Sequence, residues 1–453
     1  MRPTDSFLDT IAAAATPAGR SALALVRLSG PESSRILAAL APGLSAPPPE
    51  RRPRRATLVD RGGTPIDDAV VTFFPAGSSP TGEDVVELSL HGSPVAVARL
   101  LEAARESGAR PARPGEFTER AFRAGRMDLV RAEAVRDLIE ARTGAAAKAS
   151  ARRLTGALSD RLQRIRRDLL DVSARLAAAI DFSDDVGGAL DAAAAGPLRE
   201  AVAELEGLAA TAKAGRLLSS GCRVAILGRP NAGKSTLYNA LVGEEKAIVT
   251  EIPGTTRDAL EAEIDLGGIP VTLVDTAGLR ATAERVEAIG VERARAEAAR
   301  ADAVLYVFDA AEGFLAEDAE SLALAADRPV LLVANKADRL AEGAAGLREG
   351  AVLVCGLSPD AGPVLARRLS ETIAGGVDTE ASAEVLGNLR QADLVARART
   401  ASADALAALE GGTPLEYAVT HCHAALDALA DLVGETTSED VLERLFSTFC
   451  VGK

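Results

Sequence analysis

The chain of 453 residues contains no tryptophan, only three tyrosines and ten phenylalanines, so aromatic residues make up 3% of it. Apolar residues nevertheless account for 47%, which is enough for ordinary buried cores. These cores must therefore be built mainly from alanine, leucine and valine. Because alanine loses no side-chain entropy on joining a helix, this composition favours helical structure. At roughly 150 residues per domain, the length predicts about three domains.

Long hydrophobic runs are also missing. A helix that crosses a bilayer needs about 20 consecutive apolar residues, and no stretch approaches that length. The first residues, Met1–Asp9, include acids and lack the apolar centre of a signal peptide. We therefore expect a soluble cytoplasmic protein with no membrane partner.

Cysteine is scarce, and the spacing of the four thiols excludes both a zinc knuckle and a disulfide framework. They are Cys222, Cys355, Cys422 and Cys450. His421 and His423 flank one of them, but neighbours on a helix point about 100° apart, so the three side chains cannot converge on one metal ion. We interpret them as surface or packing residues.

The net charge of −14 argues against a protein that coats nucleic acid over its whole surface. The charge is uneven, since residues 123–170 contain 12 basic and 6 acidic side chains. A local basic face there could hold phosphates. A solvated helix surface explains the same charges equally well.

The pattern of strand-like and helical runs divides the chain into segments 1–122, 123–218, 219–380 and 381–453. The first alternates β-type runs with Gly and Pro clusters, which predicts a small α/β domain. Its expected elements are strands at Ser21–Leu28, Ala56–Val59, Ala69–Phe74 and Val85–Leu90 and a helix at Pro94–Ser107.

Segments 123–218 and 381–453 are predicted to be helical, because apolar residues recur at spacings of three and four. Expected helices cover Asp128–Phe182 and about Pro197–Leu217. In 219–380, strands alternate with helices, which predicts a parallel sheet covered on both faces. Its expected strands are Arg223–Leu227, Pro270–Val274, Ala303–Phe308, Val330–Ala334 and Ala351–Val354, with helices expected from Lys234 and after Glu284. The simplest arrangement is one discontinuous helical bundle with this α/β domain inserted between its halves.

The sequence GRPNAGKS, Gly228–Ser235, follows the apolar run Val224–Leu227 and precedes a helical pattern. That is the context of a phosphate-binding loop, whose backbone amides and helix N-terminus attract phosphate. Lys234 would neutralise the β- and γ-phosphates, and the Ser235 hydroxyl would bind Mg²⁺. The expected nucleotide-binding residues are Asn231, Ala232, Gly233, Lys234, Ser235 and Thr236.

A second motif, DTAG at Asp275–Gly278, ends the apolar run Val271–Val274. Asp275 would hold Mg²⁺ through water, and the Gly278 amide would meet the γ-phosphate. Between the two motifs, the sequence GTTRD supplies Thr256, the expected second Mg²⁺ ligand, in a loop that orders with the triphosphate.

The sequence NKAD, Asn335–Asp338, follows the run Val330–Ala334. The Asp338 carboxylate can accept hydrogen bonds from both the ring NH and the amino group of guanine, a pair that adenine does not offer, and Lys336 can lie over the base. This motif predicts GTP rather than ATP. The loop behind the base should read like Ser-Ala-Lys, but here it reads Cys355-Gly356-Leu357, whose backbone amides could still contact guanine.

Many GTPases place a glutamine after DTAG to orient the attacking water, but Leu279 stands here. Arg257 and Arg280 flank the switch segments, yet spacing assigns neither as an arginine finger. Another group must therefore orient the water and stabilise the charge on the transferring phosphoryl group.

Further long segments lie outside the nucleotide motifs: IAAAATPAGR (Ile11–Arg20), VRLSGP (Val26–Pro31), TGEDVVELSLHG (Thr81–Gly92), RPGEFTERAFRAGRMDL (Arg113–Leu129) and FCVGK (Phe449–Lys453). With these segments the chain resembles the MnmE (TrmE) family of tRNA modification GTPases over nearly its whole length. The resemblance implies a Ras-like P-loop GTPase domain in which K⁺ replaces the arginine finger. Its ligands would come from Asn231, Thr250, Ile252 and Thr255, and the two threonines would also contact GTP. Glu287 would orient the water, which makes the catalytic set Glu287, Lys234 and Asp275.

The resemblance also implies that the N-terminal domain is similar to folate-binding one-carbon domains and forms a constitutive homodimer. The residues matching a site for 5-formyl- or methylene-tetrahydrofolate are Arg27, Glu87, Arg126 and Lys453. The family commonly has lysine where Arg126 stands, and a second glycine where Ser93 stands. Without the resemblance, Arg27 and Glu87 are candidates for a structural ion pair. A Cys450 thiolate in the C-terminal tail could assist one-carbon chemistry.

As its partner, the resemblance implies a flavin-dependent protein, MnmG (GidA), in a heterotetramer. Together they would form 5-carboxymethylaminomethyl- or aminomethyluridine at the wobble position of tRNAs, with the carbon drawn from tetrahydrofolate. One alternative is a ribosome-assembly GTPase, although we find no recognisable RNA-binding module. Another is a folate-dependent methyl-transfer enzyme with an attached GTPase, although no NAD or flavin fingerprint is present.

Overall fold

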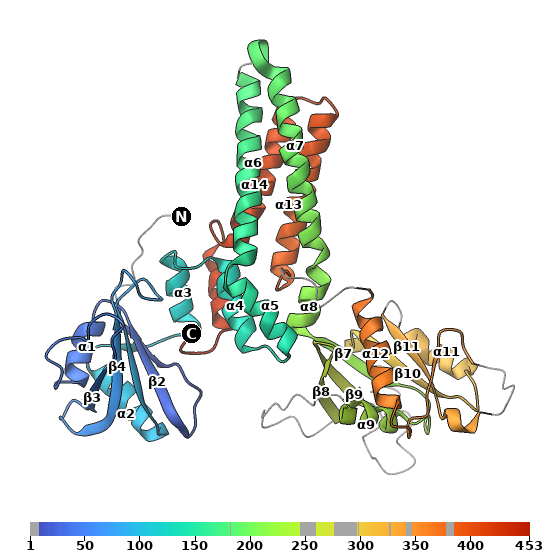
Figure 1. Ribbon diagram of the computed structural model, residues 1–453, viewed down its shortest axis with the longest axis horizontal. Helices are drawn as coiled ribbons and strands as arrows, with labels where there is room; N and C mark the ends of the chain where they lie inside the picture. The colour runs from blue at the N-terminus through green and yellow to red at the C-terminus, as the bar shows by residue number, and fades with distance from the viewer. Residues whose placement is uncertain are drawn as a thin grey trace. The chain divides into compact units, whose positions relative to one another are not determined.

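The computed structural model describes residues 9–181, 183–244, 260–275, 297, 299–325, 328–340, 347–376 and 385–453 (Figure 1). The chain forms two compact units: unit 1 is Met1–Arg136 with His423–Lys453, and unit 2 is Asp137–Cys422. Each unit contains one six-stranded sheet. Within the described ranges, none of the helices is both long enough and apolar enough to span a bilayer.

The sheet of unit 1 has the strand order β3-β4-β5-β2-β1-β6. Its strands are β1 Ile11–Ala14, β2 Ser21–Ser29, β3 Arg54–Val59, β4 Pro65–Phe74, β5 Val85–Gly92 and β6 Arg110–Pro111. Neighbours are antiparallel except for β1 and β6, which are parallel. The four predicted strands are confirmed as β2 to β5. β1 and β6 were not predicted, because they are too short to show a period.

Two helices, α1 Ser33–Leu40 and α2 Pro94–Glu106, cover one face of this sheet. Ile36 of α1 and Leu100 of α2 are fully buried in the same cluster as Val26 and Leu28 of β2. Because successive strand residues point to opposite faces, Arg27 points to the other face. The helix predicted at Pro94–Ser107 is confirmed as α2, which begins with Ser93 as N-cap and Pro94 in its first turn, whereas α1 was not predicted.

Unit 1 also contains α3 Glu116–Arg123, most of α4 Leu129–Ile139, the end of α14 Leu415–Val433, and α15 Glu439–Ser447. The ring of Phe122 in α3 packs 6.2 Å from the ring of Phe446 in α15. Beyond α15, Val451 forms an antiparallel bridge with Pro114, and the Phe117 amide donates to the Lys453 carbonyl at 3.1 Å. The C-terminal residues are therefore fixed beside the start of α3.

The helices of unit 2 are α5 Gly144–Leu154, α6 Ala157–Asp181, α7 Ser183–Ala210, α8 Ala212–Ser220 and α13 Leu389–Glu410, together with the start of α14. The predicted helical run from Asp128 is confirmed, but it is divided. The Thr143 hydroxyl caps α5 by accepting from the Ala146 amide, and Gly156, at φ +100°, separates α5 from α6. The predicted helix start at Pro197 is wrong, since this proline lies inside α7.

α13 follows the second sheet in the chain but packs against α7, which precedes it (Figure 1). The segment that leads into α13 is held closely. A Cβ atom on Gly215 of α8 would lie 1.6 Å from the Leu386 carbonyl oxygen, so no side chain fits there. The Gly387 amide also donates to Gln391 Oε1 at 2.7 Å, and the Gln391 side chain is fully buried. These contacts fix the point where the chain returns from the sheet to the helices.

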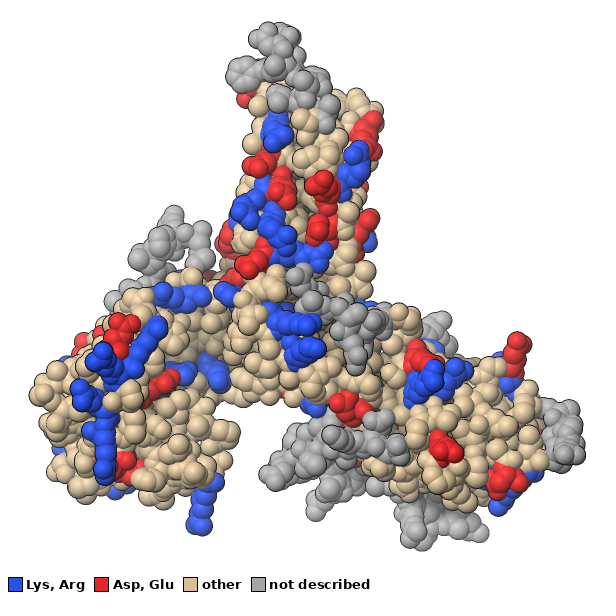
Figure 2. All heavy atoms as spheres, in the orientation of Figure 1, with Lys and Arg blue, Asp and Glu red and all other residues tan. Residues whose placement is uncertain are grey.

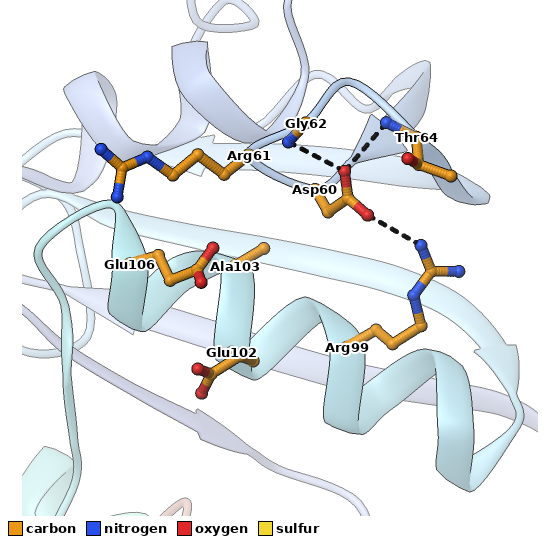
Figure 3. A pocket seen from close by; sticks show the side chains of 8 residues that line it. All are labelled: Asp60, Arg61, Gly62, Thr64, Arg99, Glu102, Ala103 and Glu106. Atoms are coloured by element: carbon orange, nitrogen blue, oxygen red, sulfur yellow. Dashed lines mark hydrogen bonds and ion pairs between the residues drawn. The ribbon is translucent and has the colours of Figure 1, made fainter.

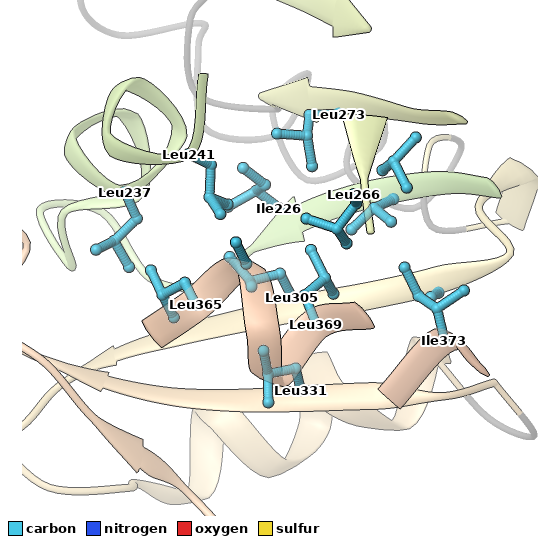
Figure 4. Packing of buried hydrophobic residues seen from close by; sticks show 14 of the residues in the cluster. Ile226, Leu237, Leu241, Leu266, Leu273, Leu305, Leu331, Leu365, Leu369 and Ile373 are labelled. Atoms are coloured by element: carbon cyan, nitrogen blue, oxygen red, sulfur yellow. The ribbon is translucent and has the colours of Figure 1, made fainter. Parts of the chain in front are cut away.

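The sheet of unit 2 has the strand order β12-β11-β10-β7-β9-β8. The strands are β7 Cys222–Leu227, β8 Leu260–Leu266, β9 Ile269–Asp275, β10 Ala303–Asp309, β11 Val330–Asn335 and β12 Val352–Leu353. Helices α9 Lys234–Glu244 and α12 Ala361–Ala374 cover one face, where Leu237 and Leu365 pack with Ile226 (Figure 4). A second cluster, around Val304 and Tyr306, lies on the other face. The five predicted strands and the helix from Lys234 are confirmed.

The five predicted strands are parallel to their neighbours as expected, but a sixth strand that was not predicted, β8, runs antiparallel to β9 at one edge. Only Gly267 and Gly268 join these strands, at φ +60° and +88°. A two-residue turn with positive φ at both positions allows only an antiparallel hairpin, whereas parallel strands need a long crossover. The helix predicted after Glu284 begins outside the described residues.

Candidate nucleotide site

The loop Gly228–Ser235 joins β7 to α9 and turns back on itself. Gly228, Asn231 and Gly233 have φ of +142°, +62° and +95°. A Cβ atom on Gly228 would lie 2.0 Å from the Val307 carbonyl oxygen, and one on Gly233 would lie 2.2 Å from Asn335 Nδ2. Glycine is therefore required at both positions for steric as well as conformational reasons. This is the phosphate-binding loop expected from the sequence, at the carboxyl end of a parallel strand.

Lys234 begins α9 and is largely buried. Its ammonium donates to the carbonyl oxygens of Gly228 and Arg229, each at 2.8 Å, so the side chain spans the loop. Burial lowers the pKa of Lys234, and the neighbouring Asp275 carboxylate opposes that shift. The ammonium is thus held at the centre of the loop by two neutral carbonyl oxygens. Phosphate oxygens are charged and therefore stronger acceptors, so they can replace these carbonyl oxygens when nucleotide binds.

Ser235 and Asp275 meet as the Mg²⁺ prediction requires. The Ser235 hydroxyl donates to Asp275 Oδ2 at 2.8 Å, and Asp275, at the end of β9, is fully buried. A hydroxyl and a carboxylate oxygen are ligands that Mg²⁺ accepts, so the pair fits the ion. In the described part of the chain, no cluster of three or more His, Cys, Asp or Glu side chains could hold a metal ion. Further ligands for Mg²⁺ would come from phosphate oxygens, water and the predicted Thr256, which lies outside the described residues.

Asn335, at the end of β11, connects three loops. Its Nδ2 donates to the Ala232 carbonyl oxygen in the phosphate-binding loop, and its Oδ1 accepts from the Gly356 amide, both at 2.9 Å. The loop predicted to lie behind the base therefore begins where expected, after β12. Cys355 is half-buried, Gly356 is anchored to Asn335, and 83% of the Leu357 side chain is exposed.

Lys336 and Asp338 follow on this edge of the sheet. Lys336 adopts φ +61°, and its ammonium lies 2.8 Å from Asp309 Oδ2. Burial would raise the pKa of Asp309, but the hydrogen bonds from Lys336 and from the Ala311 amide outweigh burial, so this pKa is lowered. Asp338 lies in a single 3₁₀ turn, Ala337–Arg339, and is exposed, so its carboxylate is available to a base. Sequence reasoning missed Asp309, although its place at the end of β10, next to β7 and β11, was a usable signal.

Several predicted site residues lie outside the described residues. They are Thr250, Ile252, Thr255, Thr256, Gly278 and Glu287, together with Arg257, Leu279 and Arg280. The structure therefore brings together Lys234, Ser235, Asp275 and Asn335, which frame one side of the expected site.

In unit 1, Arg27 and Glu87 face each other across β2 and β5. The Arg27 guanidinium donates to Glu87 Oε1 at 3.0 and 2.7 Å, so the two residues form an ion pair. The guanidinium also lies 5.5 Å from the centre of the Phe117 ring, and the amide of Phe117 binds the Lys453 carbonyl oxygen. Arg27, Glu87 and the C-terminus are therefore neighbours through Phe117.

Arg126 belongs to a different set of contacts. Its guanidinium donates to the carbonyl oxygens of Ala76 and Gly77, at 2.7 and 2.8 Å.

A cavity of about 570 Å³ also lies in unit 1, where Figure 3 shows Arg99 pointing toward Asp60, with 3.0 Å between Nη2 and Oδ2. Among the described residues that line this cavity, none belongs to the predicted folate set.

The cysteines differ sharply in their surroundings. Burial raises the pKa of Cys222 to about 12 and that of Cys422 to about 11, which makes both thiols unreactive at neutral pH. Cys450 is a free thiol and is exposed in the C-terminal tail, where its carbonyl oxygen accepts from the Gly115 amide. It is therefore accessible for the chemistry that the resemblance implies.

Some of the charges on the helices of unit 2 form ion pairs. Figure 2 shows blue and red side chains interspersed along the helical part on the visible face. Arg161 of α6 binds Glu204 of α7 at 2.6 Å, and Arg199 of α7 binds Glu410 of α13 at 2.6 Å. This mixture matches the interpretation of the basic segment as a solvated helix surface.

Comparison with known families matches almost the whole chain to two domain models. Residues 10–126 match the model of the GTP-binding protein TrmE N-terminus. Residues 129–450 match the model of the MnmE helical domain. The break between the two matches lies between α3 and α4.

Full-length relatives share a single description, tRNA modification GTPase MnmE. The protein of Alkalilimnicola ehrlichii is 42% identical over 449 residues, covering 98% of this chain and 99% of the relative. That of Koribacter versatilis is 43% identical over 458 residues, and that of Roseiflexus castenholzii is 39% identical over 467 residues, each with the same coverage.

Proposed function

Because this chain belongs to the MnmE family of tRNA modification GTPases, we propose that it is a K⁺-stimulated GTPase that forms 5-carboxymethylaminomethyl- or aminomethyluridine at the wobble position of tRNAs. It is a GTP hydrolase that acts in tRNA modification. The wobble-uridine product, the K⁺ stimulation, the MnmG (GidA) partner and the tetrahydrofolate carbon are the parts we add. The observation that carries the proposal is the meeting of Lys234 and Ser235, in the phosphate-binding loop, with Asp275 at the end of β9.

GTP would be bound by residues of 219–380, a GTPase domain inserted in a helical domain formed by 123–218 and 381–453. The loop amides and Lys234 would hold the phosphates, Ser235 and Thr256 would hold Mg²⁺, and Asp338 would select guanine. Mg²⁺ would supply positive charge that offsets the negative charge of the phosphates. Thr236, Thr250 and Thr255 would complete the nucleotide contacts, and Glu287 would orient the attacking water.

Asn231 supports the K⁺ proposal because it is exposed in the phosphate-binding loop with φ +62°. Its side-chain oxygen would join Thr250, Ile252 and Thr255 as a ligand, and the bound K⁺ would supply the positive charge of an arginine finger. Closure of this site would require two GTPase domains to approach each other in the homodimer.

We expect GTP hydrolysis to be at least about tenfold faster in KCl than in NaCl at equal ionic strength, because an arginine finger contributes about 10³–10⁵ to the rate. Asn231→Ala should abolish the difference. Asn239→Ala, the same change at an exposed position in α9, should retain it. Phosphate release measured in the two salts distinguishes the cases, and equal rates for the unaltered protein would exclude the K⁺ site.

A conformational cycle would connect hydrolysis to the modification chemistry. The β8–β9 hairpin supports a route, because it lies between the segments that hold Thr256 and Gly278. At its turn the Gly268 carbonyl oxygen accepts from the Thr143 hydroxyl at 2.7 Å. Arg142 reaches Glu263 of β8, with 2.7 Å between Nη1 and Oε1. Movement of the hairpin would therefore act directly on the connection between α4 and α5.

The folate site would lie in segment 1–122, where the homodimer also forms. The neighbouring Arg27, Glu87 and C-terminal Lys453 support it, and the Cys450 thiol is exposed in the same C-terminal tail. Arg27 already occupies one oxygen of Glu87, so a bound pterin would use the other oxygen. Arg126 would have to leave its two carbonyl partners to reach the same ligand. The base chemistry would belong to the cytoplasmic complex with the flavoprotein and tRNA.

A further inference from the structure

The second residue of the phosphate-binding loop, Arg229, is anchored by its side chain to another part of unit 2. Its Nε donates to Asp318 Oδ1 at 3.0 Å, and its Nη1 donates to Glu312 Oε2 at 2.8 Å. The two carboxylates differ in surroundings: the Asp318 side chain is fully buried, and 59% of the Glu312 side chain is exposed. Only the first is protected from solvent screening, so the pair with Asp318 is the strong one.

Asp318 is itself rigidly held. Its Oδ1 also accepts from the Tyr306 hydroxyl at 2.9 Å, and its Oδ2 accepts from the Leu315 amide at 2.8 Å, at the start of α11, Ala316–Leu322. Tyr306 belongs to β10 and is fully buried. Burial raises the pKa of Tyr306, so its hydroxyl stays protonated and remains a donor. Both oxygens of Asp318 are therefore fixed by the sheet and the helix before they bind Arg229.

The ion pair of Arg229 with Asp318, which we call the anchor, is connected to the nucleotide site through the main chain of Arg229. The carbonyl oxygens of Gly228 and Arg229 hold the Lys234 ammonium, and the Arg229 oxygen also accepts from the Ala232 amide at 3.4 Å. The next residues include Asn231, which needs a left-handed backbone. A loop with this backbone that lacked an anchor would have to be ordered by the ligand, and that ordering weakens binding.

We propose that Asp318, supported by Tyr306, positions the phosphate-binding loop through Arg229, which makes it a positioning residue for the GTPase reaction. The anchor preorganises the loop before nucleotide binds. Once phosphates occupy the loop, their own contacts hold it. Loss of the anchor therefore affects the free protein more than the nucleotide complex, and it weakens ground-state and transition-state binding equally.

The test compares Asp318→Asn with Glu312→Gln, since both changes remove one carboxylate charge from the same guanidinium. We expect Asp318→Asn to raise the Kd for a fluorescent GDP analogue and the KM for GTP by about tenfold, while kcat stays within about threefold. Glu312→Gln should leave both within about twofold, because an exposed pair contributes little. Thermal unfolding of the nucleotide-free full chain reports separately on the fold.

A double-mutant cycle identifies Arg229 as the route. Arg229→Met should raise Kd like Asp318→Asn, the two changes together should cost no more than either alone, and Arg229→Lys should recover part of the loss. Tyr306→Phe, a change that keeps the shape of the buried ring, should raise Kd less and in the same direction. If Asp318→Asn is poorly folded, a cycle of Arg229→Met with Tyr306→Phe replaces it. Because Tyr306 supports the same anchor, the two changes together should again raise Kd no more than Arg229→Met alone.

The proposal is overturned if the effects of Arg229→Met and Asp318→Asn on the free energy of nucleotide binding add independently. It is overturned as well if Glu312→Gln weakens nucleotide binding as much as Asp318→Asn. It is also overturned if Asp318→Asn lowers the unfolding temperature while Kd and KM stay within about twofold.

Discussion

Replacement of Lys234 by alanine is expected to lower kcat/KM for GTP by about a hundred- to a thousandfold. The ammonium is held by two loop carbonyl oxygens, each at 2.8 Å, beside the buried Asp275. In the proposed complex with GTP, this charge would meet the developing negative charge on the bridging and γ-phosphate oxygens. No other lysine or arginine side chain is placed to substitute for it among the described residues of the loop, because Arg229 is committed to Asp318.

The measurement is steady-state phosphate release at several GTP concentrations. Lys148→Ala is the matched control, because Lys148 is exposed on α5 and lies outside the nucleotide site. Both variants should retain the unfolding temperature of the unaltered protein in the absence of nucleotide. A Lys234→Ala protein that hydrolyses GTP within about tenfold of the normal rate would show that the phosphates bind elsewhere.

Asp338→Asn is expected to reverse the base preference of the protein. In the proposed complex the carboxylate would accept from the ring NH and the amino group of guanine, whereas an amide can accept one hydrogen bond and must donate the other. Xanthine has an oxygen in place of the guanine amino group, so it matches the amide. The affinity for GDP should fall by about a hundredfold or more, because a site built to bind a polar group leaves its partner unpaired when the match is lost.

Competition of GDP and xanthosine diphosphate for the same protein measures this reversal. Asp338 is exposed in its 3₁₀ turn, so the change should leave the fold intact. Asp393→Asn provides a control at an exposed position of α13. Continued preference of Asp338→Asn for guanine would mean that another group reads the base.

The nucleotide motifs could be predicted from the sequence because their chemistry is local. Gly228 and Gly233 have positive φ within a single loop, and a short glycine-rich motif in front of a helix signals such a loop without reference to the rest of the fold. Lys234 and Ser235 follow the same strand, and Asp275 ends the neighbouring one. Strand ends of a parallel sheet meet at one edge, so a pattern along the chain was enough to place these residues together.

The anchors of the site could not be predicted, because they depend on which distant strands become neighbours. Arg229 and Asp318 are 89 residues apart, and Lys336 and Asp309 are 27 residues apart. The antiparallel β8 was missed for a related reason: its direction is set by two glycines whose φ angles the sequence does not specify. The start of α7 was misplaced because a proline usually begins a helix, whereas here alanine-rich sequence continues on its N-terminal side.

The central claim is that wobble-uridine modification requires GTP hydrolysis, and that this hydrolysis requires Asp275. Mass spectrometry of nucleosides from the total tRNA of a strain lacking this gene tests it most directly. We predict that the uridines modified at carbon 5 disappear, return with the unaltered gene, and stay absent with Asp275→Ala. Unchanged nucleosides in the deletion strain would contradict the account, and ribosome assembly would then be the leading role for this GTPase.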